Sequence, residues 1–163
     1  MAEQKIIPNL WFDTQAEEAA AYYIDVLGSG RVTAVMRYPE GSGPQTGTAM
    51  AVEFEAGGMR FVGINGGPQF PFTEAVSLQI DCVDQAEVDR FWDRFIGDGG
   101  EESMCGWLKD KYGLSWQIVP QGMLELFNDP DPSRAQRAVQ AMMQMRKLDV
   151  AALRAAADGV PVG

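Results

Sequence analysis

The side chains of this sequence that could do chemistry are few, because the chain contains no histidine. That absence excludes Ser–His–Asp triads, histidine general bases and every metal site that uses an imidazole ligand. Two cysteines, Cys82 and Cys105, are the soft nucleophiles that remain. They are too few for a disulfide framework, so we expect both to be reduced thiols in a reducing compartment, the cytoplasm.

Cys105 opens the segment that carries the densest set of candidate groups. Trp107 and Lys109 follow it at alternate positions, which places both side chains on one face of a short strand. Trp107 could stack on a ligand, and Lys109 could pair with an anionic group or activate the Cys105 thiol. The alternative is an edge strand with a surface lysine, in which Cys105 is a buried and inert thiol.

Asp81 is a candidate general base, although this role would require burial of its carboxylate. The sequence offers no second acid, base or nucleophile at a defined spacing from Asp81. A catalytic pair is therefore not evident from the residue types and their order.

Length and charge limit the partners of the chain. A sequence of 163 residues has the size of one domain. Its formal charge of −10 repels phosphate backbones and anionic membrane surfaces, so we expect neither nucleic acid nor a membrane as a partner. The sequence contains no apolar run of about 18 residues that would span a membrane, and residues 1–4 do not begin a secretory signal.

The elements that must position these groups recur in the order strand, helix and three strands. The first helix is predicted to begin at a capping box of Thr14 and Glu17, and the second at Asp84 and Glu87. Gly28 and Gly97 end these helices, and Gly57-Gly58 forms a tight hairpin. The predicted strands are residues 5–12, 31–38, 48–55 and 59–65, and then 75–82, 101–104, 106–109 and 114–119.

The letters of the two halves repeat as well as their pattern. Gln15-Ala16-Glu17 recurs as Gln85-Ala86-Glu87, each at the start of a helix. Gly58-Met59-Arg60-Phe61 matches Gly113-Leu114-Ser115-Trp116, each at the start of the last strand of its module. Two matches in the same order indicate an internal duplication. The predicted fold is therefore α+β, with two tandem βαβββ modules that form a curved mixed sheet.

The composition changes after residue 120, and a helical tail is predicted there. Asp131 can cap a helix that has Pro132 at its first position, and an apolar stripe continues to Ala152 before Gly159 ends the helix. We expect a domain over residues 1–120, with module one at 5–66 and module two at 74–120, followed by a C-terminal helical extension over residues 121–163.

Two further motifs identify a family. They are Phe61-Val62-Gly63-Ile64-Asn65-Gly66-Gly67-Pro68 and the run from Cys105 to Gln117, CGWLKDKYGLSWQ. Together with the duplicated modules and the helix ending YYIDVLG, they resemble the PhnB-like branch of the vicinal-oxygen-chelate superfamily, which includes glyoxalase I, bleomycin-resistance proteins and extradiol dioxygenases. The resemblance covers residues 5–120 and implies a glyoxalase-like fold.

Members of this branch are often labelled 3-demethylubiquinone methyltransferase domains. The sequence does not support that activity, because no Gly-rich turn joins a strand to a helix with an acidic residue downstream, as a Rossmann-like cofactor fold needs.

The resemblance also implies four metal-ligand positions on the first and last strands of the two modules. Counting from the shared motifs places them at Pro8, Val62, Ser77 and Gln117, with Gln79 as the alternative to Ser77. None of these side chains is the carboxylate, imidazole or thiolate that transition metals require. We therefore expect no metal and no other cofactor.

If these positions face the cup, the concave face between the sheet halves, their i±2 neighbours face it too. The ligand-binding residues predicted in this way are Phe12, Arg60, Ser77, Gln79, Asp81 and Gln117, with Leu10, Ile64 and Ser115 beside them. Trp11, Phe61, Leu78, Ile80, Trp116 and Ile118 are predicted to pack beneath the helices. An arginine with two amides would favour an anionic or carbonyl-bearing ligand. The alternative is a collapsed cup whose polar groups bond to one another.

These residues lead to three hypotheses about function. The first is a small-molecule-binding protein without the superfamily metal site, which sequesters or senses its ligand as the resemblance to bleomycin-resistance proteins implies. The second is a metal-independent enzyme that acts on a small polar organic substrate through Asp81 or Cys105, with glyoxalase-like, dioxygenase-like or methyltransferase chemistry. The third is an interaction module that uses the methionines at 142–145 as an adaptable surface.

A homodimer is expected as well. Members of the superfamily commonly pair modules across chains, and the apolar stripe of the predicted tail helix would otherwise be exposed.

Overall fold

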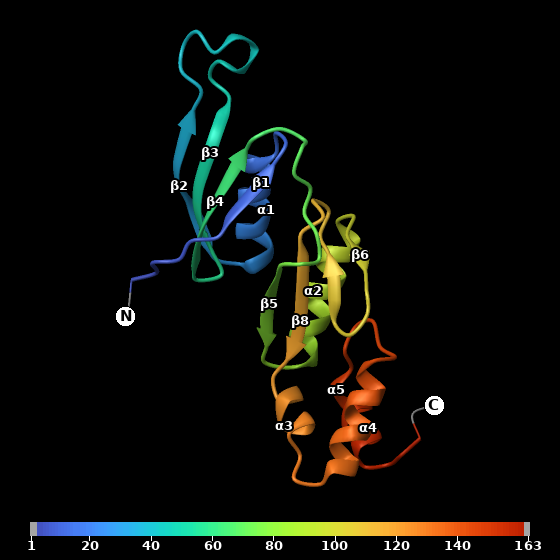
Figure 1. The fold of residues 1–163 in the computed structure, drawn as a ribbon. Coiled ribbons are helices and arrows are strands. Elements are labelled where there is room, and N and C mark those ends of the chain that lie inside the picture. Colours follow the sequence, from blue (N-terminus) through green and yellow to red (C-terminus); the bar gives the residue numbers. More distant parts are fainter. Residues whose placement is uncertain (1–2, 162–163) are drawn as a thin grey trace. The chain divides into compact units, whose positions relative to one another are not determined.

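The computed structural model describes residues 3–161; the outermost ends of the predicted ranges, residues 1–2 and 162–163, lie outside the described residues. The chain divides into two compact units between Phe72 and Thr73. Each unit contains a four-stranded mixed sheet, in the order β1-β4-β3-β2 in the first and β5-β8-β7-β6 in the second (Figure 1). The predicted α+β fold of tandem βαβββ modules with C-terminal helices is confirmed.

The first unit consists of β1 (Asn9–Phe12), α1 (Ala16–Leu27), β2 (Gly30–Arg37), a short 3₁₀ helix η1 (Gly43–Gln45), β3 (Ala49–Ala56) and β4 (Met59–Asn65). Strand β1 is parallel to β4, and the other pairs are antiparallel. Helix α1 covers one face of the sheet, where Tyr23 packs on Phe54 at 6.4 Å between ring centroids and Phe54 stacks on Phe61 at 5.3 Å. The core of this unit therefore lies between α1 and β3–β4.

The start of α1 differs from the predicted capping box. Gln15 is the N-cap residue, and no side chain of the cap accepts a hydrogen bond from the first turn. Instead, the backbone N–H of Ala16 donates to Oδ1 of Asn65 at 2.8 Å, and Nδ2 of Asn65 donates to the carbonyl oxygen of Ala49 at 3.0 Å. A residue distant in sequence thus satisfies the helix terminus, so the Thr14 prediction is wrong.

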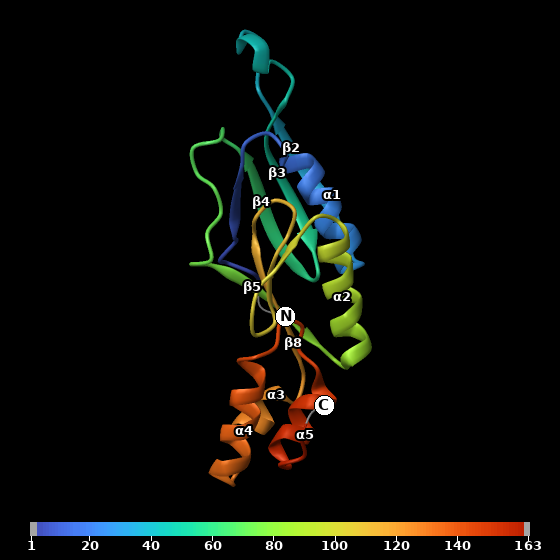
Figure 2. The same cartoon turned by 90° about the vertical axis from the view of Figure 1, so that its right-hand side faces the viewer.

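The second unit begins with β5 (Ser77–Cys82), α2 (Gln85–Gly97), β6 (Glu101–Glu102), β7 (Trp107–Lys109) and β8 (Ser115–Pro120). The predicted cap of α2 is confirmed, because the Asp84 carboxylate accepts from the backbone N–H of Glu87 at 2.9 Å. Phe95 of α2 packs on Trp116 of β8 at 5.0 Å between ring centroids. Each helix therefore covers one face of its own sheet (Figure 2).

The turn between β7 and β8 is organised by a buried carboxylate. Asp110 is 3% exposed. It accepts hydrogen bonds from the backbone N–H of Tyr112 at 2.8 Å, from that of Leu114 at 3.1 Å and from Nε1 of Trp116 at 2.9 Å. The LKDKYGLSW part of the family motif therefore has a structural role, which is to fix this turn against the core.

The tail forms three helices in place of the single long helix that was predicted. They are α3 (Met123–Phe127), α4 (Pro132–Met142) and α5 (Val150–Ala157). Asp131 caps α4 with Pro132 at its first position, as predicted, and Asp149 caps α5. Among residues 3–161, no helix is both long and apolar enough to cross a membrane.

The break between α4 and α5 is held by the β6–β7 connection. The backbone N–H groups of Cys105 and Gly106 donate to the carbonyl oxygens of Met145 and Arg146 at 2.7 and 2.8 Å. Leu148 is fully buried, and its Cδ1 would lie 2.8 Å from a Cβ built on Gly106. These tertiary contacts interrupt the helix, and they attach the extension to the second unit.

Candidate functional site

The face of the second sheet that is opposite to α2 carries the predicted polar residues. Register pairs Gln79 of β5 with Gln117 of β8, and Gln117 with Trp107 of β7. Partners on adjacent strands share a face, and residues two apart along a strand do so as well. This face, which we call the open face, therefore carries Ser77, Gln79, Asp81, Trp107, Lys109, Ser115 and Gln117.

On the open face, the side-chain amides of Gln79 and Gln117 donate hydrogen bonds through their nitrogen atoms, which leaves their carbonyl oxygens as acceptors. Nε2 of Gln79 donates to Oδ1 of Asp81 at 2.6 Å, and Nε2 of Gln117 donates to Oγ of Ser77 at 2.9 Å. The Gln79 amide must present its nitrogen to Asp81, because an ionised carboxylate only accepts. The carbonyl oxygen of that amide consequently remains an acceptor for a ligand.

A pocket of about 350 Å³ opens at the carboxyl ends of β5 and β8. Gln79, Asp81 and Gln117 form its polar side. Its other walls are Val119, Pro120 and residues 121–125, which lead from β8 into α3. Val119, Pro120, Met123 and Leu124 are apolar, whereas Gln121 and Glu125 add polar groups. Such a mixed lining suits a small organic molecule.

Trp107 and Lys109 share the open face but do not line this pocket. The Lys109 ammonium pairs with the Glu74 carboxylate. This hydrogen bond raises the pKa of Lys109 and lowers the pKa of Glu74. Lys109, which the sequence offered as a partner for an anionic ligand, is therefore occupied by a neighbouring side chain.

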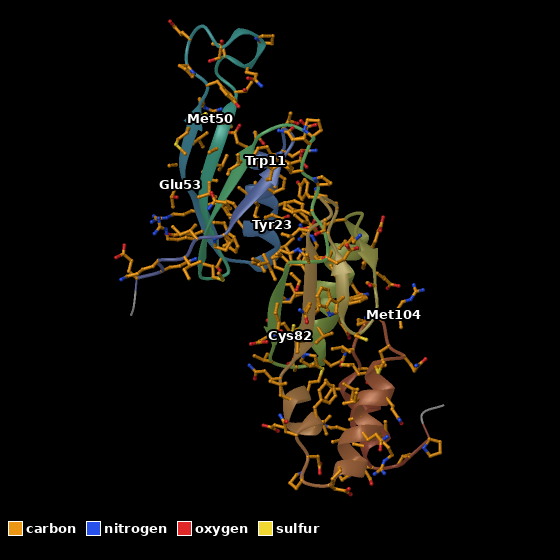
Figure 3. All side chains as sticks on the ribbon, viewed as in Figure 1. Trp11, Tyr23, Met50, Glu53, Cys82 and Met104 are labelled. Atoms are coloured by element: carbon orange, nitrogen blue, oxygen red, sulfur yellow. The ribbon has the colours of Figure 1, made fainter. Side chains whose placement is uncertain are left out.

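The two cysteines lie outside the pocket. Cys82, at the end of β5 (Figure 3), is fully buried, and burial raises the pKa of its thiol to about 12. The thiol is then protonated at neutral pH and is a poor nucleophile. Cys105 has a positive φ of 60° in the turn that binds the tail, so the backbone at this position has a structural role.

The first unit corrects the predicted facing of β1. Phe12 is 4% exposed, and a Cβ built on Gly63 would lie 3.5 Å from its ring and 3.2 Å from Cβ of Ala16 in α1. Phe12 therefore belongs to the helix side of the sheet and not to the cup. Trp11 lies on the other face, where its indole N–H donates to the carbonyl oxygen of Gly67 at 2.9 Å and its ring packs on Phe70.

The strand register also bears on the metal-ligand position that was counted at Pro8. The residue in register with Val62 is Asn9, just as Gln79 is in register with Gln117. The internal repeat aligns Asn9 with Gln79 and Val62 with Gln117. If the ligand positions that the resemblance implies follow this register, they hold three neutral amides and one valine, and the set counted with Ser77 likewise offers no carboxylate, imidazole or thiolate. Within residues 3–161, no group of three or more His, Cys, Asp or Glu side chains could hold a metal ion.

Arg60 lies on β4, two residues before Val62, and its side chain is exposed. Its backbone is bound by the Gln4 amide, which accepts from its N–H at 2.8 Å and donates to its carbonyl oxygen at 3.1 Å. Arg60 belongs to the first unit and the two glutamines to the second. Their convergence on one ligand stays a prediction.

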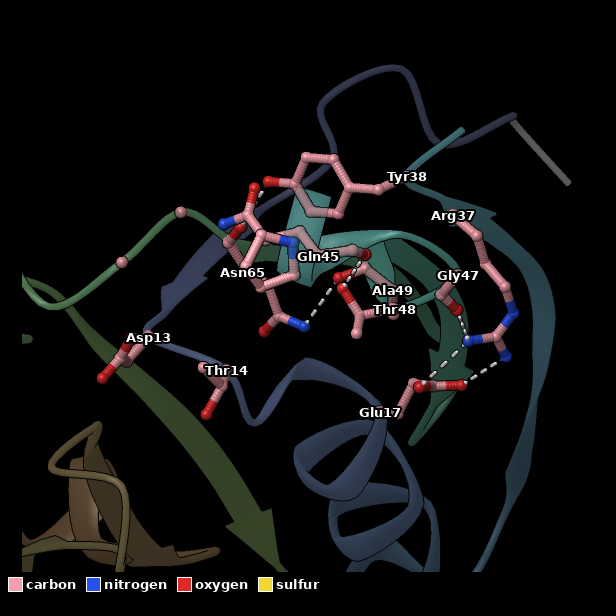
Figure 4. Close-up of a pocket in the computed structure, with 13 residues that line it drawn as sticks. Asp13, Thr14, Glu17, Arg37, Tyr38, Gln45, Gly47, Thr48, Ala49 and Asn65 are labelled. Carbon is pink, nitrogen blue, oxygen red and sulfur yellow. Dashed lines mark hydrogen bonds and ion pairs between the residues drawn. The ribbon is translucent and has the colours of Figure 1, made fainter. Parts of the chain in front are cut away.

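A larger pocket, of about 680 Å³, lies within the first unit and was not predicted (Figure 4). It is bounded by the start of α1, the end of β2, the following loop and the end of β4. The Arg37 guanidinium pairs with Glu17 at 2.9 Å and donates to the carbonyl oxygen of Gly47 at 3.3 Å. Tyr38 donates to the carbonyl oxygen of Asn65 at 3.4 Å. The residues that line this pocket come from four separate segments of the chain, so no local sequence signal indicates the pocket.

Known proteins resemble the chain in sequence as well as in fold. A family model described as 3-demethylubiquinone-9 3-methyltransferase matches residues 4–119. The chain belongs to this family. A putative 3-demethylubiquinone-9 3-methyltransferase, PhnB protein, from Bacillus cereus is 32% identical, with a TM-score of 0.64 over 72% of this chain and 99% of its own.

More distant structures share only their fold with this member of the 3-demethylubiquinone-9 3-methyltransferase family. PA1353 from Pseudomonas aeruginosa is 21% identical, with a TM-score of 0.59 over 72% of this chain and 98% of its own. The fosfomycin resistance protein FosX from Mesorhizobium loti is 12% identical, with a TM-score of 0.54 over 77% and 97%. Among curated proteins, none matches the chain. The resemblance to the PhnB-like family is confirmed by the family model and by the Bacillus cereus PhnB protein.

We expect this family member to bind no stoichiometric transition metal. Asn9, Val62, Gln79 and Gln117 provide no carboxylate, imidazole or thiolate, which zinc, nickel and manganese sites need. Elemental analysis after dialysis against buffer, with and without prior addition of each metal, checks this. About one ion per chain, or a melting temperature that falls when EDTA is added, would contradict the expectation.

Proposed function

We propose that the chain is a small-molecule-binding protein of the PhnB-like glyoxalase fold that works without the superfamily metal. One observation carries this proposal. Gln79 and Gln117 lie side by side in register on parallel strands and form, with Asp81, the polar side of the 350 Å³ pocket. Amides at these positions can orient a bound molecule by hydrogen bonds, whereas they are poor ligands for a metal.

Binding without catalysis fits the open face better than a metal-independent enzyme does. Asp81 is exposed and bonded to Gln79, and general-base work would favour a desolvated carboxylate. Cys82 is buried with a protonated thiol, and Cys105 does not line the pocket. No nucleophile with an adjacent base is assembled among the described pocket residues.

The family description names methyl transfer. The connections between strand and helix in this chain give that activity little support. Residues 13–15 join β1 to α1, and residues 83–84 join β5 to α2. Neither connection contains the glycines of a Rossmann-like cofactor turn.

Replacing Gln117 with leucine tests the binding site. We expect the variant to bind an open-face fragment more weakly by about 1–3 kcal/mol, because a ligand group that is buried on binding loses its hydrogen-bond partner. The fragment is first identified by NMR. A library of charged and neutral fragments is screened for members that shift the side-chain amide signals of Gln79 and Gln117. Isothermal titration then compares the parent, Gln117→Leu and, as a control, Gln144→Leu at an exposed tail position. Equal affinity of all three proteins would contradict the proposal.

We also propose that the chain forms a homodimer in a reducing compartment such as the cytoplasm. The edge strand β2 supports association, because Val32 and Met36 are 43% and 44% exposed on it and an unpaired edge is a ready surface for pairing. The tail stripe supports it less than expected, since its members Ala138 and Leu148 are buried within the unit. The free Cys82 and Cys105 are consistent with reducing conditions.

Light scattering coupled to size exclusion checks the assembly. At micromolar concentration we expect twice the chain mass of 17.8 kDa. Replacing Val32 and Met36 with lysine should shift the mass toward that of the monomer, because charge on an edge strand opposes pairing. A monomer mass for the parent protein would refute the homodimer.

A further inference from the structure

The C-terminal extension lies beyond the part of the chain that the family defines. The family match ends at residue 119, inside β8. The Bacillus cereus relative is covered over 99% of its own length, yet it covers only 72% of this chain. Helices α3, α4 and α5 are therefore an addition to the two-module core.

This addition supplies a wall of the ligand pocket. After β8, the backbone N–H of Gln121 donates to the carbonyl oxygen of Cys82 at 2.7 Å, which keeps the chain beside the end of β5. Gly122 then adopts a positive φ of 85° and caps α3. This turn brings Met123, Leu124 and Glu125 to the pocket, which they line together with residues of the open face. Figure 1 shows α3 directly after β8 and beside α4 and α5.

The extension also contributes one of the two negative charges that line the pocket. The charged residues among its lining are Asp81 from β5 and Glu125 from α3, and none is a lysine or an arginine. The Gln79 amide nitrogen is taken by Asp81, so its oxygen adds an acceptor. Leu124 is 68% exposed beside these groups, which leaves apolar surface for a ligand to cover.

We propose that α3 completes this pocket and selects a small amphiphilic molecule that carries a protonated amine. The inference rests on the proposed binding function and names its ligand class. An ammonium group would donate to Asp81, Glu125 and the Gln79 carbonyl oxygen, while an apolar body lies against Met123 and Leu124. The chain's net charge of −10 favours the approach of a cation and disfavours an anion. The earlier expectation of an anionic ligand depended on Arg60, which does not line this pocket.

Matched probes of similar size and the same phenyl group test the ligand class. The probes are 2-phenylethylamine, neutral 2-phenylethanol and anionic 3-phenylpropionate, titrated into the full-length protein and followed by calorimetry and by NMR shifts of the Gln79 and Gln117 amides. We expect the amine to bind roughly tenfold more tightly than the carboxylate at low salt, since attraction and repulsion at a partly exposed site each contribute up to about fivefold. Added salt should reduce this preference.

Two substitutions on α3 test the contribution of the extension. Glu125→Gln should weaken the amine by roughly threefold to fivefold and leave 2-phenylethanol unchanged, because only the ion pair is lost. Leu124→Ser should weaken all three probes, because each loses apolar contact. Both side chains are exposed, so folding should be intact, and a melting curve verifies this. Glu40→Gln, at an exposed position in the first unit, removes the same net charge outside the pocket and serves as the control.

The outcomes separate this inference from the proposed function. One result is binding that depends on Gln117 yet shows no preference for the amine, and another is an effect of Glu125→Gln no larger than that of Glu40→Gln. Either result would overturn the ligand class, while the proposed binding site would stand. Failure of all three probes to shift the Gln79 and Gln117 amides would overturn both. An amine preference that Glu125→Gln reduces by roughly threefold to fivefold, with 2-phenylethanol unaffected, would support the inference.

Discussion

Replacing Asp110 with alanine is expected to lower the free energy of unfolding by about 3–5 kcal/mol, because up to three N–H donors lose their acceptor and each costs about 1–3 kcal/mol when it is buried and unpaired. The donors are the backbone N–H groups of Tyr112 and Leu114 and the Trp116 indole. Leu114 and Trp116 are 2% and 3% exposed, so water does not replace the carboxylate without disturbing the core.

Two comparisons make this prediction specific. Asp110→Asn keeps one acceptor oxygen and should lose less stability than alanine does. Asp93→Ala removes an exposed carboxylate whose Oδ1 is 3.3 Å from Lys147, and surface pairs of this kind contribute about 0–1 kcal/mol. Urea denaturation of all three variants provides the free energies. Equal losses for Asp110→Ala and Asp93→Ala would show that the turn does not depend on the buried carboxylate.

The strand and helix order was predictable because hydrophobic period and turn residues agree along most of the core. Both capping motifs looked alike in sequence, yet only Asp84 caps its helix, since α1 is capped from Asn65 on a distant strand. A residue 49 positions away leaves no local signal. The open face of the second unit was predictable because Trp116 and Ile118 alternate with polar Ser115 and Gln117, which defines the two faces.

The facing of β1 was not predictable by the same reasoning. Residues 10–12 are Leu, Trp and Phe, so both faces of the strand are apolar and alternation does not distinguish them. Trp11 is covered on the open side by Gly67 and Phe70. Counting from the motifs placed a ligand position at Pro8, whereas the residue in register with Val62 is Asn9.

The break between α4 and α5 was hidden for a related reason. The tail was read as a continuous stripe because Met142, Met145 and Leu148 keep helical spacing. Tertiary hydrogen bonds from Cys105 and Gly106 take the carbonyl groups that a continuous helix would use. The sequence signal for the break was Asp149, which caps α5 through the N–H of Ala152.

Replacing Leu148 with alanine should destabilise the second unit by about 2–5 kcal/mol, the range for a fully buried leucine whose removal leaves a cavity. Leu148 has no exposed surface, and its carbonyl oxygen accepts from Nε2 of Gln85 at 2.9 Å. Its side chain contacts Gly106 beside the hydrogen bonds that attach the tail. Leu124→Ala, at a 68% exposed position of α3, is the matched control and should change stability by less than about 0.5 kcal/mol.

A double-mutant cycle with Gly106→Ala establishes whether Leu148 acts through this contact. Gly106 has a φ of 82°, and a methyl group there would lie 2.8 Å from Cδ1 and 2.9 Å from Cγ of Leu148. Alone, Gly106→Ala should therefore cost more than the roughly 1–2 kcal/mol of left-handed backbone strain. In the Leu148→Ala background the clash with the Leu148 side chain is gone, whereas the approach to the Ile118 carbonyl oxygen at 3.1 Å remains. The new methyl also fills part of the cavity, so the combined loss should be smaller than the sum by about 1 kcal/mol or more. Additive losses in urea denaturation would mean that the two residues do not meet, and the tail would then have to be held by its backbone hydrogen bonds and its ion pairs.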